Sequence, residues 1–263
     1  QMNCVLKKRK WLSGLLAGWL LFAGIQLPAG AQEPSVSAQS AVVIEAQTGK
    51  ILYEKNAFEQ RPMASTTKIM TALIALEQPG IDAPFVVDEA AIQVEGTSMG
   101  LKTGDTVTLR ALACGMLMAS GNDAANGAAV RISGALPAFA QKMNERARQI
   151  GMEQTHFVTP SGLDAESHYS TAYDMALLAR EAIRNEDFLA ICSQKKITAE
   201  YGNPPYKRTL SNHNRLLSLY EGTIGVKTGF TKKAGRCLIS AAQRDGITLI
   251  CATLKAPDDW DDH

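Results

Sequence analysis

The sequence predicts an α/β protein of the α+β type, in which an antiparallel sheet is built from both chain ends and an all-helical lobe lies between them. Three observations favour this fold. Strand-like stretches occur near both ends, and the middle carries apolar residues at helical spacing. With 263 residues, of which 46% are apolar and 20% charged, the chain can bury a full hydrophobic core.

The first 31 residues have the layout of a secretory signal peptide. Four basic residues, 7–10, precede the uncharged stretch 11–27, and small residues follow at 28–31. The expected cleavage after Ala31 removes four cations and no acids, which changes the net charge from +1 to −3. The alternative is an uncleaved anchor, because the uncharged stretch is just long enough to span a bilayer. Residues 32–40 are small and polar and are expected to form a linker.

The remaining elements follow in order within one domain, residues 41–263. Residues 41–46 and 50–54 are β-rich and predict a hairpin. Apolar residues at helical spacing predict helices over 65–77, 109–118, 123–132, 137–150 and 172–185. Pro204-Pro205 marks a loop, and strands are expected over 222–227, 237–243 and 248–254. The helical lobe therefore spans about residues 66–200, inserted between the sheet strands, and a cleft between lobe and sheet is the expected ligand site.

Composition argues against several classes of function. A mildly acidic mature chain gives no support for nucleic-acid binding. Four histidines and the absence of a C-x-x-C pair make a metal site unexpected, and no cofactor is indicated. Cys114, Cys237 and Cys251 have apolar neighbours and are expected in the core. A disulfide between Cys237 and Cys251 is left open, since the two flank a turn.

Ser65 and Lys68 form the first of three motifs that together indicate serine acyl transfer. A serine hydroxyl needs a base within hydrogen-bond reach, and residues i and i+3 share one face of a helix. A lysine acts as a base once burial or a second cation lowers its pKa. The alternative for Ser65 is a helix N-cap. The motif alone is weak, because Ser193 and Lys196 repeat its spacing.

Ser120 and Asn122 form the second motif, which lies at a break between two predicted helices. From this break both side chains can project into the same cleft, where they add a hydroxyl and an amide to the site. The alternative is that one of them caps the following helix.

Lys227, Thr228 and Gly229 form the third motif, on a predicted strand. Lys227 is the candidate second cation, and Gly229 would let a substrate backbone approach closely. Residues 102–104 repeat the tripeptide, but they precede a helix, where a glycine turn is the ordinary explanation. The three motifs in this order indicate a nucleophile, a base, a proton relay and a carboxylate clamp.

The quoted motifs and their flanks resemble a known family. The matching stretches are Arg61–Ala72, Ala119–Ala125, Ser161–Asp164, His168–Ala172 and Gly225–Thr231. From about residue 33 to residue 262 the chain resembles the penicillin-binding D-alanyl-D-alanine carboxypeptidases, which are low-molecular-mass serine peptidases of bacterial cell walls. The resemblance implies a β-lactamase/transpeptidase-like fold and a hydrolase that acts in peptidoglycan biosynthesis.

The resemblance also assigns roles residue by residue. Ser65 would attack the peptide bond between two D-alanines at the end of a peptidoglycan stem peptide, Lys68 would take its proton, and Ser120 would protonate the departing nitrogen. Asn122 would hold the substrate amide. Lys227, Thr228 and Gly229 would form the strand that binds the terminal carboxylate. The backbone N–H groups of Ser65 and Phe230 would form the oxyanion hole. His213 aligns with a basic residue that helps to hold that carboxylate in relatives. β-Lactams would acylate Ser65 as covalent inhibitors.

Two other functions stay open. A serine β-lactamase shares the three motifs, and Glu166 falls where such enzymes carry a water-activating carboxylate, but the context differs. A non-catalytic penicillin- or wall-binding protein would be expected to have lost Ser65 or Lys68, and both are present.

The location of the protein follows from the same resemblance. The protein is expected to be exported and to act at the extracytoplasmic face of the bacterial membrane, in the cell-wall space. Family members often add a small β domain and an amphipathic membrane-binding helix. The sequence contains neither, which leaves membrane association open.

Overall fold

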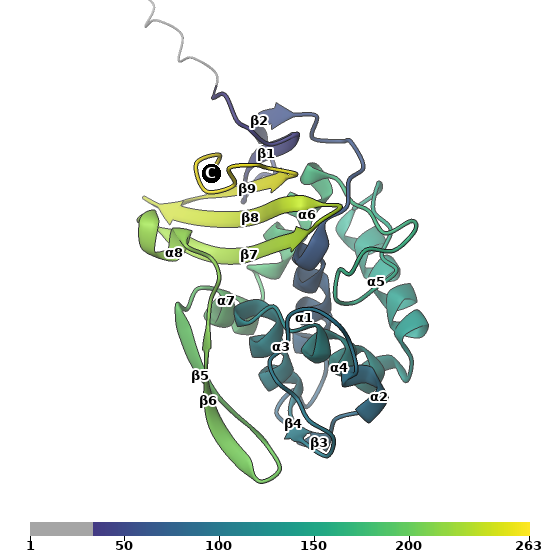
Figure 1. Cartoon of the computed structure of the whole chain (residues 1–263). Helices are drawn as coiled ribbons and strands as arrows, with labels where there is room; N and C mark the ends of the chain where they lie inside the picture. Colours follow the sequence, from purple (N-terminus) through teal and green to yellow (C-terminus); the bar gives the residue numbers. More distant parts are fainter. Residues whose placement is uncertain (1–33) are drawn as a thin grey trace, which may run out of the picture. The chain divides into compact units, whose positions relative to one another are not determined.

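A five-stranded antiparallel sheet, in the order β2-β1-β9-β8-β7, joins the two ends of the chain in the computed structural model, which describes residues 34–263 (Figure 1). The first two strands come from the N-terminal side of the domain and the other three from its C-terminal side. The predicted sheet from both chain ends is therefore confirmed. The strands are β1 (Ser40–Glu45), β2 (Ile51–Lys55), β7 (Thr223–Thr231), β8 (Gly235–Arg244) and β9 (Ile247–Leu254).

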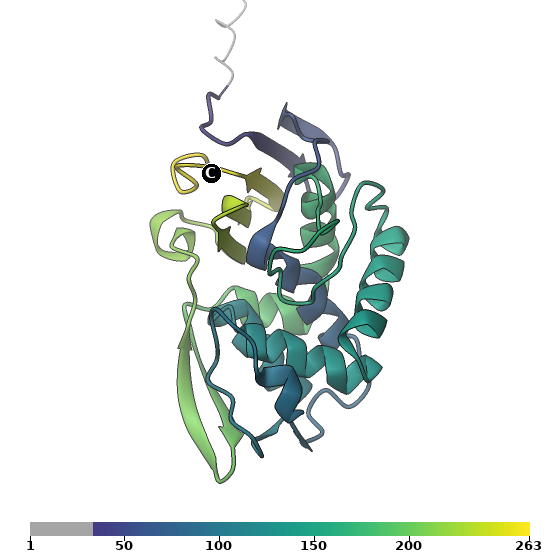
Figure 2. The ribbon, with the colours of Figure 1, turned by 45° about the vertical axis from the view of Figure 1, so that its right-hand side comes forward.

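The helical lobe is built around α1, all nine residues of which are buried. Because α1 is apolar nearly all round, it needs neighbours on every side, and five helices supply them. Figure 2 shows α5 along the outer side of this lobe. One of the five, α6, also packs on β1 and β9 and so joins the lobe to the sheet. The helices are α1 (Lys68–Leu76), α3 (Leu109–Met118), α4 (Asn122–Ser133), α5 (Leu136–Ile150), α6 (Ala172–Ala182) and α7 (Glu186–Cys192).

Capping residues explain where these helices begin and end. The Thr108 side chain accepts a hydrogen bond from Ala111 N at the start of α3, and Thr171 does the same for Asp174 N at the start of α6. Helices α4 and α5 end at Gly134 and Gly151, both of which have positive φ angles.

The predicted helix over 172–185 is two helices. Asn185 does not continue α6, because its side chain accepts a hydrogen bond from Phe188 N and so caps the start of α7. The chain therefore turns after Ala182, and α7 packs against both α1 and β7.

The segment around Pro204-Pro205 is the turn of a hairpin rather than a loop between the lobe and the sheet. Strand β5 (Lys196–Gly202) pairs with β6 (Pro205–Ser211) from end to end. Proline at the first position of β6 is compatible with a strand that begins at a turn. This hairpin lies inside the region predicted to be all-helical, so the lobe is not purely helical.

Several short elements were not predicted. They are the 3-10 turn η1 (Ala64–Thr67), β3 (Phe85–Val86), α2 (Glu89–Ile92), β4 (Thr106–Val107) and α8 (Leu216–Leu219). The first matters most, because the stretch predicted as one helix from residue 65 begins with a tighter turn before α1.

The four cysteines of the described chain are free. In the sheet Cys237 lies opposite Leu254, whereas Cys251 lies opposite Ser240. Side chains alternate between the two faces of a strand, so Cys237 and Cys251 point to opposite faces of the sheet. The open alternative of a Cys237–Cys251 disulfide is therefore wrong.

The predicted signal peptide, residues 1–31, lies outside the described residues, as does the first part of the predicted linker. Ser40, the last residue of that linker, already belongs to β1. Across residues 34–263, every helix falls short of the length and apolar character that crossing a membrane requires.

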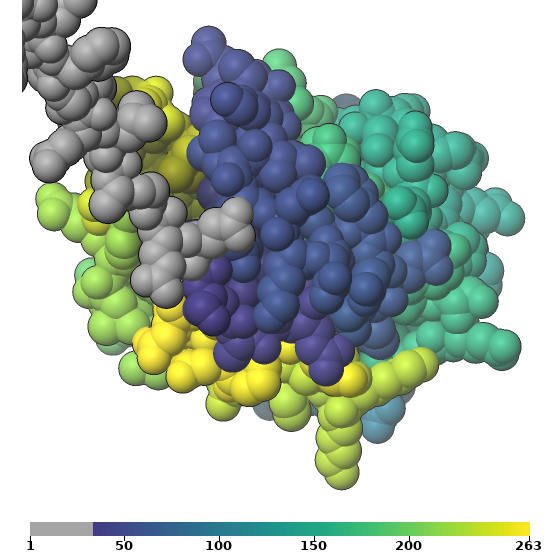
Figure 3. All heavy atoms as spheres, turned by 90° about the horizontal axis from the view of Figure 1, so that it is seen from above, coloured from purple at the N-terminus to yellow at the C-terminus, as the bar shows by residue number. Residues whose placement is uncertain are grey.

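Residues from the two ends of the domain lie side by side at the surface, as Figure 3 shows in purple and yellow. Ser37 donates from its backbone N to Asp262 Oδ1 at 2.6 Å, and Ala38 N donates to Asp262 Oδ2 at 2.8 Å. These bonds hold the start of the domain next to its last residues.

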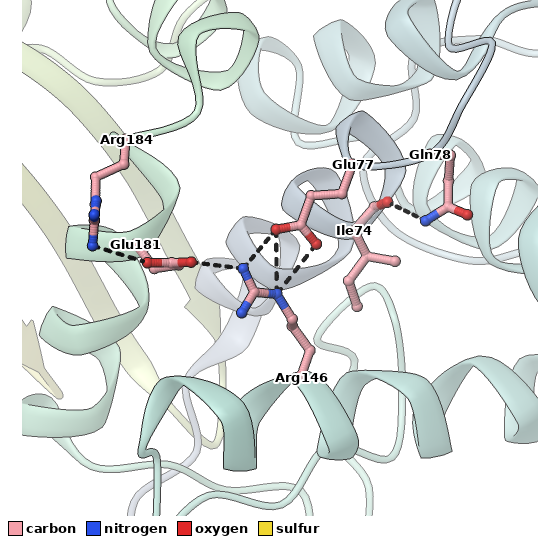
Figure 4. A network of polar contacts seen from close by, with 6 residues as sticks. All are labelled: Ile74, Glu77, Gln78, Arg146, Glu181 and Arg184. Carbon is pink, nitrogen blue, oxygen red and sulfur yellow. Dashed lines mark hydrogen bonds and ion pairs between the residues drawn. The ribbon is translucent and has the colours of Figure 1, made fainter.

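A charged network fastens three helices of the lobe to one another (Figure 4). The Arg146 guanidinium in α5 donates to both oxygens of Glu77, at the end of α1, and to Glu181 Oε1 in α6 at 2.7 Å. Arg184 is 74% exposed and lies only at the edge of the network, 3.7 Å from Glu181. A planar guanidinium with two carboxylate partners is worth more than an isolated surface pair.

Replacing Arg146 by methionine should lower the free energy of unfolding by about 1–2 kcal/mol, because two carboxylates lose their charged donor. Urea denaturation at low salt measures the change. Arg184→Met is the matched control and should stay within about 0.5 kcal/mol of wild type. Equal effects of the two substitutions would show that the network does not hold the helices together.

Candidate active site

Ser65 lies in the 3-10 turn at the start of α1, with Ala64 before it in the left-handed region at φ +48°. Thr66 and Thr67 on either side of the turn are fully buried, whereas Ser65 is only half-buried. The helix-cap alternative for Ser65 does not hold, since the capping positions are Met63 and Thr67. Ser65 is thus held rigidly with its hydroxyl accessible.

The turn is pressed into place by a neighbouring loop. Gly162 has φ +84°, and a Cβ at this position would lie 2.0 Å from the carbonyl oxygen of Ala64. Only glycine permits this approach. The same loop is tied to α1 by Thr71, whose hydroxyl donates to the carbonyl of Pro160 at 2.6 Å.

Lys68 is completely buried, and its Nζ has three oxygen neighbours. It lies 2.9 Å from Ser65 Oγ, 2.7 Å from Asn122 Oδ1 and 2.6 Å from the carbonyl oxygen of Ser161. The amide and carbonyl oxygens can only accept, so they take two N–H bonds. When Lys68 is neutral, its remaining lone pair therefore faces the hydroxyl of Ser65.

Ser120 and Asn122 lie in the turn between α3 and α4, and both side chains point at a lysine. Ser120 Oγ accepts from Lys227 Nζ at 3.0 Å, while Asn122 Oδ1 accepts from Lys68. Neither side chain caps α4, whose N-cap is Gly121 without a side-chain bond. Ser120 has φ +58°, a strained conformation for a residue with a side chain.

Lys227 reaches the site from the middle of the edge strand β7. It is 2% exposed, and its Nζ donates to the carbonyl of Thr228 at 2.8 Å besides contacting Ser120. Sequence analysis expected the strand to end at Lys227, but it continues to Thr231.

Both lysines have lowered pKa values. For Lys68 burial is the largest cause, and the charge of Lys227 adds to it, so the pKa lies well below the usual 10.5. Burial lowers the pKa of Lys227 to about 7. Two buried ammonium groups in one site disfavour each other, and the pair therefore favours loss of a proton from Lys68 at neutral pH.

Strand β7 runs directly past the turn that carries Ser65. A Cβ at Gly229 would lie 3.0 Å from the backbone nitrogens of both Ser65 and Thr66. Glycine at this position lets the strand approach the turn, and it brings Phe230, which is 65% exposed, to the mouth of the site.

A cavity of about 290 Å³ opens above Ser65. Six of the residues that line it were predicted from the sequence: Ser65, Ser120, His213, Thr228, Gly229 and Phe230. Four were not predicted: Thr97, Arg236, Asp259 and Trp260. A larger cavity of about 620 Å³, near the start of β7, contains none of the predicted residues. The smaller cavity is the one that reaches the reactive groups, and we name it the cleft.

His213 lies in the cleft but does not carry the charge that was expected of it. Burial and the nearby charge of Lys227 lower its pKa below 6.5. At neutral pH its imidazole is therefore neutral and can bind a carboxylate only as a hydrogen-bond donor. Arg236, 3.7 Å from the buried Asp259, is a permanent cation in the same cleft.

Residues that the sequence analysis did not single out hold the site together. The carbonyl groups of Ser161 and Glu95 fix Lys68 and Asn122, and His168 fixes the turn before α1. His168 Nδ1 accepts from Val158 N at 2.9 Å, so its Nε2–H donates to Thr67 Oγ1. Ser161 and His168 lie in the quoted family-like stretches, which was the only signal for them.

The repeated motifs take no part in this site. Ser193 ends α7 and Lys196 begins β5. At the second tripeptide, Lys102 N donates to Asp105 Oδ2, and Gly104 has φ +83°, which is the expected glycine turn. Within residues 34–263 no group of three histidine, cysteine, aspartate or glutamate side chains could hold a metal ion.

Comparison with known proteins points in one direction. The family model described as D-alanyl-D-alanine carboxypeptidase matches residues 28–258. The carboxypeptidase DacF of Bacillus subtilis is 39% identical over 229 residues, which cover 83% of this chain and 57% of DacF. DacB2 of Mycobacterium tuberculosis is 36% identical over 230 residues, covering 86% of this chain and 78% of the relative. The chain thus spans little more than half of DacF.

Solved structures agree with the sequence relatives. The DD-transpeptidase of Streptomyces strain K15 superposes with a TM-score of 0.81 at 33% identity, covering 86% of this chain and 92% of that one. A D-alanyl-D-alanine carboxypeptidase from Mycobacterium tuberculosis gives a TM-score of 0.82 at 35% identity, with 87% of both chains covered.

His168 should make the folded chain sensitive to acid. Burial lowers its pKa from 6.5 to about 4. The unfolded chain therefore binds the proton first, so the stabilisation is full above pH 6.5 and is lost as pH falls through 4. Between pH 7 and 4.5 this linkage should cost about 2–3 kcal/mol in the free energy of unfolding. Urea unfolding of His168→Asn at both pH values should show a drop smaller by that amount. The exposed His156→Asn should keep the full drop; a full drop in both variants would contradict the assignment.

Proposed function

This chain belongs to the D-alanyl-D-alanine carboxypeptidase family of serine hydrolases, and on that premise we propose that it removes the terminal D-alanine from peptidoglycan stem peptides through an acyl-enzyme on Ser65. The observation that carries the proposal is the geometry at Lys68. A buried amine whose other two positions are occupied by obligatory acceptors lies 2.9 Å from the hydroxyl that it would deprotonate.

Acylation follows from this arrangement. Ser65 Oγ attacks the carbonyl between the two D-alanines, and its proton passes to the lone pair of Lys68. The negative oxygen of the tetrahedral intermediate lies between the backbone N–H groups of Ser65 and Phe230, an interaction often worth ~3–4 kcal/mol. The close approach of β7 at Gly229 supports this pairing, since it brings the two backbones together.

Departure of D-alanine needs a proton on its nitrogen. Ser120 lies between that nitrogen and the lysines, and its Oγ is 3.0 Å from Lys227 Nζ. Ser120 would give up its proton to the leaving group and recover one from Lys68. Water then attacks the ester carbon, with Lys68 as base, and releases the shortened peptide and free Ser65.

Substrate binding uses the remaining residues of the cleft. Asn122 would hold the amide of the acyl part, while Lys227, Thr228 and Gly229 would bind the terminal carboxylate. His213 would contribute only a neutral hydrogen bond there, for the reason given by its lowered pKa. A β-lactam resembles the D-Ala-D-Ala end and would acylate Ser65 in place of the substrate.

The β-lactamase alternative is disfavoured by the position of Glu166. This carboxylate is exposed and is not among the residues that line the cleft, so it is badly placed to activate a deacylating water. A long-lived penicillin adduct is therefore expected. Whether water or an amine accepts the acyl group is a separate question, which one relative's name, DD-transpeptidase, raises.

We further infer that the protein is exported and acts in the cell-wall space, with membrane association left to be tested. The basic and apolar layout of residues 1–31 supports export. N-terminal sequencing of the exported protein should find Gln32 as its first residue.

Ser65→Ala should abolish both labelling by a fluorescent penicillin and release of D-alanine from a peptide ending in D-Ala-D-Ala, because no other hydroxyl faces Lys68 among the described residues. Ser193→Ala, in the repeated motif, is the matched control and should behave as wild type. The lifetime of the wild-type adduct is read in the same assay. Turnover of many per second would instead favour a β-lactamase, and D-alanine release by Ser65→Ala would contradict the mechanism.

The pH profile of kcat/KM should fall above about pH 7, because free Lys227 then loses the charge that binds the substrate carboxylate. Below this range the profile should rise with pH as Lys68 becomes neutral. Bound carboxylate stabilises the charged form of Lys227, so kcat should fall only at higher pH. Lys227→Arg should remove the fall in kcat/KM, since arginine stays charged. Lys102→Arg, in the repeated tripeptide, should leave it in place; a fall that survives Lys227→Arg would assign it to another group.

A further inference from the structure

The turn that carries Ser120 and Asn122 is strained and is held from outside by one segment, residues 95–101. Thr97 grips the turn twice: its hydroxyl donates to the carbonyl of Ser120 at 2.6 Å, and its own carbonyl accepts from Asn122 N at 2.7 Å. These two bonds secure the positive φ angle of Ser120, which the residue would not adopt by itself.

The same segment decides which way the Asn122 amide faces. Asn122 Nδ2 donates to the carbonyl of Glu95 at 2.7 Å, which leaves Oδ1 to accept from Lys68. A flipped amide would place two donors, Nδ2 and Lys68 Nζ, against each other. Gly96 permits the contact, since a Cβ there would lie 2.7 Å from Nδ2.

The segment is itself anchored by Asp123, the residue after Asn122. Its carboxylate is 2% exposed and accepts four hydrogen bonds from consecutive residues. The donors are Ser98 Oγ, Met99 N, Gly100 N and Leu101 N, at 2.6, 2.9, 3.1 and 3.0 Å. A buried carboxylate with this many donors is a strong and rigid contact.

The hairpin β5–β6 holds the segment from its other side. Tyr201 donates its hydroxyl proton to the carbonyl of Met99 at 2.7 Å, and Arg208 Nη1 donates to the carbonyl of Gly100 at 2.8 Å. The Arg208 guanidinium also lies 4.6 Å from the ring centroid of Tyr201 and 4.1 Å from that of Tyr206. The segment is thus fixed on both sides, and Asp123 is its link to the catalytic turn.

We propose that Asp123 is a positioning residue: by clamping residues 98–101 it fixes Thr97 and Glu95, which in turn hold Ser120 and Asn122 against Lys227 and Lys68. Asp123 touches neither the cleft nor Ser65. Its effect on the reaction is therefore indirect, and the inference rests on the proposed serine acyl-transfer function.

Charge gives this residue a signature that a purely structural contact lacks. The charged groups that act on Lys68 are Lys227, which lowers the pKa, and Asp123, which raises it. Removing the negative charge of Asp123 should therefore lower the pKa of Lys68 further. A larger fraction of Lys68 is then neutral in acid, and the rising limb of the pH profile moves to lower pH.

The test measures the second-order rate constant for acylation by benzylpenicillin from acid to neutral pH. Asp123→Asn should lower the plateau by about tenfold or more, as expected for a displaced supporting contact, and should move the rising limb to lower pH. Thr97→Val, which keeps all charges and shape, should lower the plateau without moving the limb. Asp105→Asn is the matched control, because Asp105 is also buried and accepts a backbone bond in the neighbouring turn. It should match wild type.

Hydrogen exchange of the backbone amides provides a readout that does not need enzyme activity. In Asp123→Asn the Asn122 amide, bonded to Thr97, should lose protection, and in Asp105→Asn it should not. A wild type that penicillin does not acylate would overturn the proposed function, yet lost protection would still support the positioning role. Wild-type acylation and protection in Asp123→Asn would overturn the proposal, and so would a wild-type plateau in Thr97→Val if Asp123→Asn does not fold.

Discussion

The site depends on keeping one ammonium group out of water. Lys68 has no exposed surface, and its neighbours include no carboxylate, only the hydroxyl of Ser65, the amide oxygen of Asn122 and the carbonyl of Ser161. A charged lysine in such a place is poorly solvated, which favours the neutral amine that a general base requires. The position of every other group can be understood from the need to create and preserve this environment.

The helix α1 makes the burial of Lys68 possible. Because all nine of its residues are buried, the lysine at its first position is inside the protein without any special cavity. The 3-10 turn before it then presents Ser65 to the cleft, and Gly162 and Gly229 allow a loop and a strand to press on this turn from two sides. The second buried lysine, Lys227, comes from the strand that makes one of these contacts.

Sequence reasoning located the sheet, the main helices and the clustered side chains, because these leave patterns in the residues themselves. The helix 109–118 was predicted to the residue, since its apolar period and its threonine cap agree. The hairpin β5–β6 was missed because Pro204-Pro205 suggests a loop unless the pairing partner is known. The carbonyl groups of Ser161 and Glu95 could not be found either, since a backbone acceptor has no side-chain signature. The neutral state of His213 required knowledge of its burial beside Lys227.

The most direct test of this account is the titration of the Lys68 side chain in the free protein, followed by NMR of carbon-13-labelled lysine Cε, with Lys68→Arg to assign the signal. Burial and the charge of Lys227 predict a midpoint well below the usual 10.5. Replacing Lys227 by methionine should raise that midpoint, because one of the two causes is removed. A Lys68 signal that titrates at about 10.5 in both proteins would contradict the claim that the fold keeps this amine neutral.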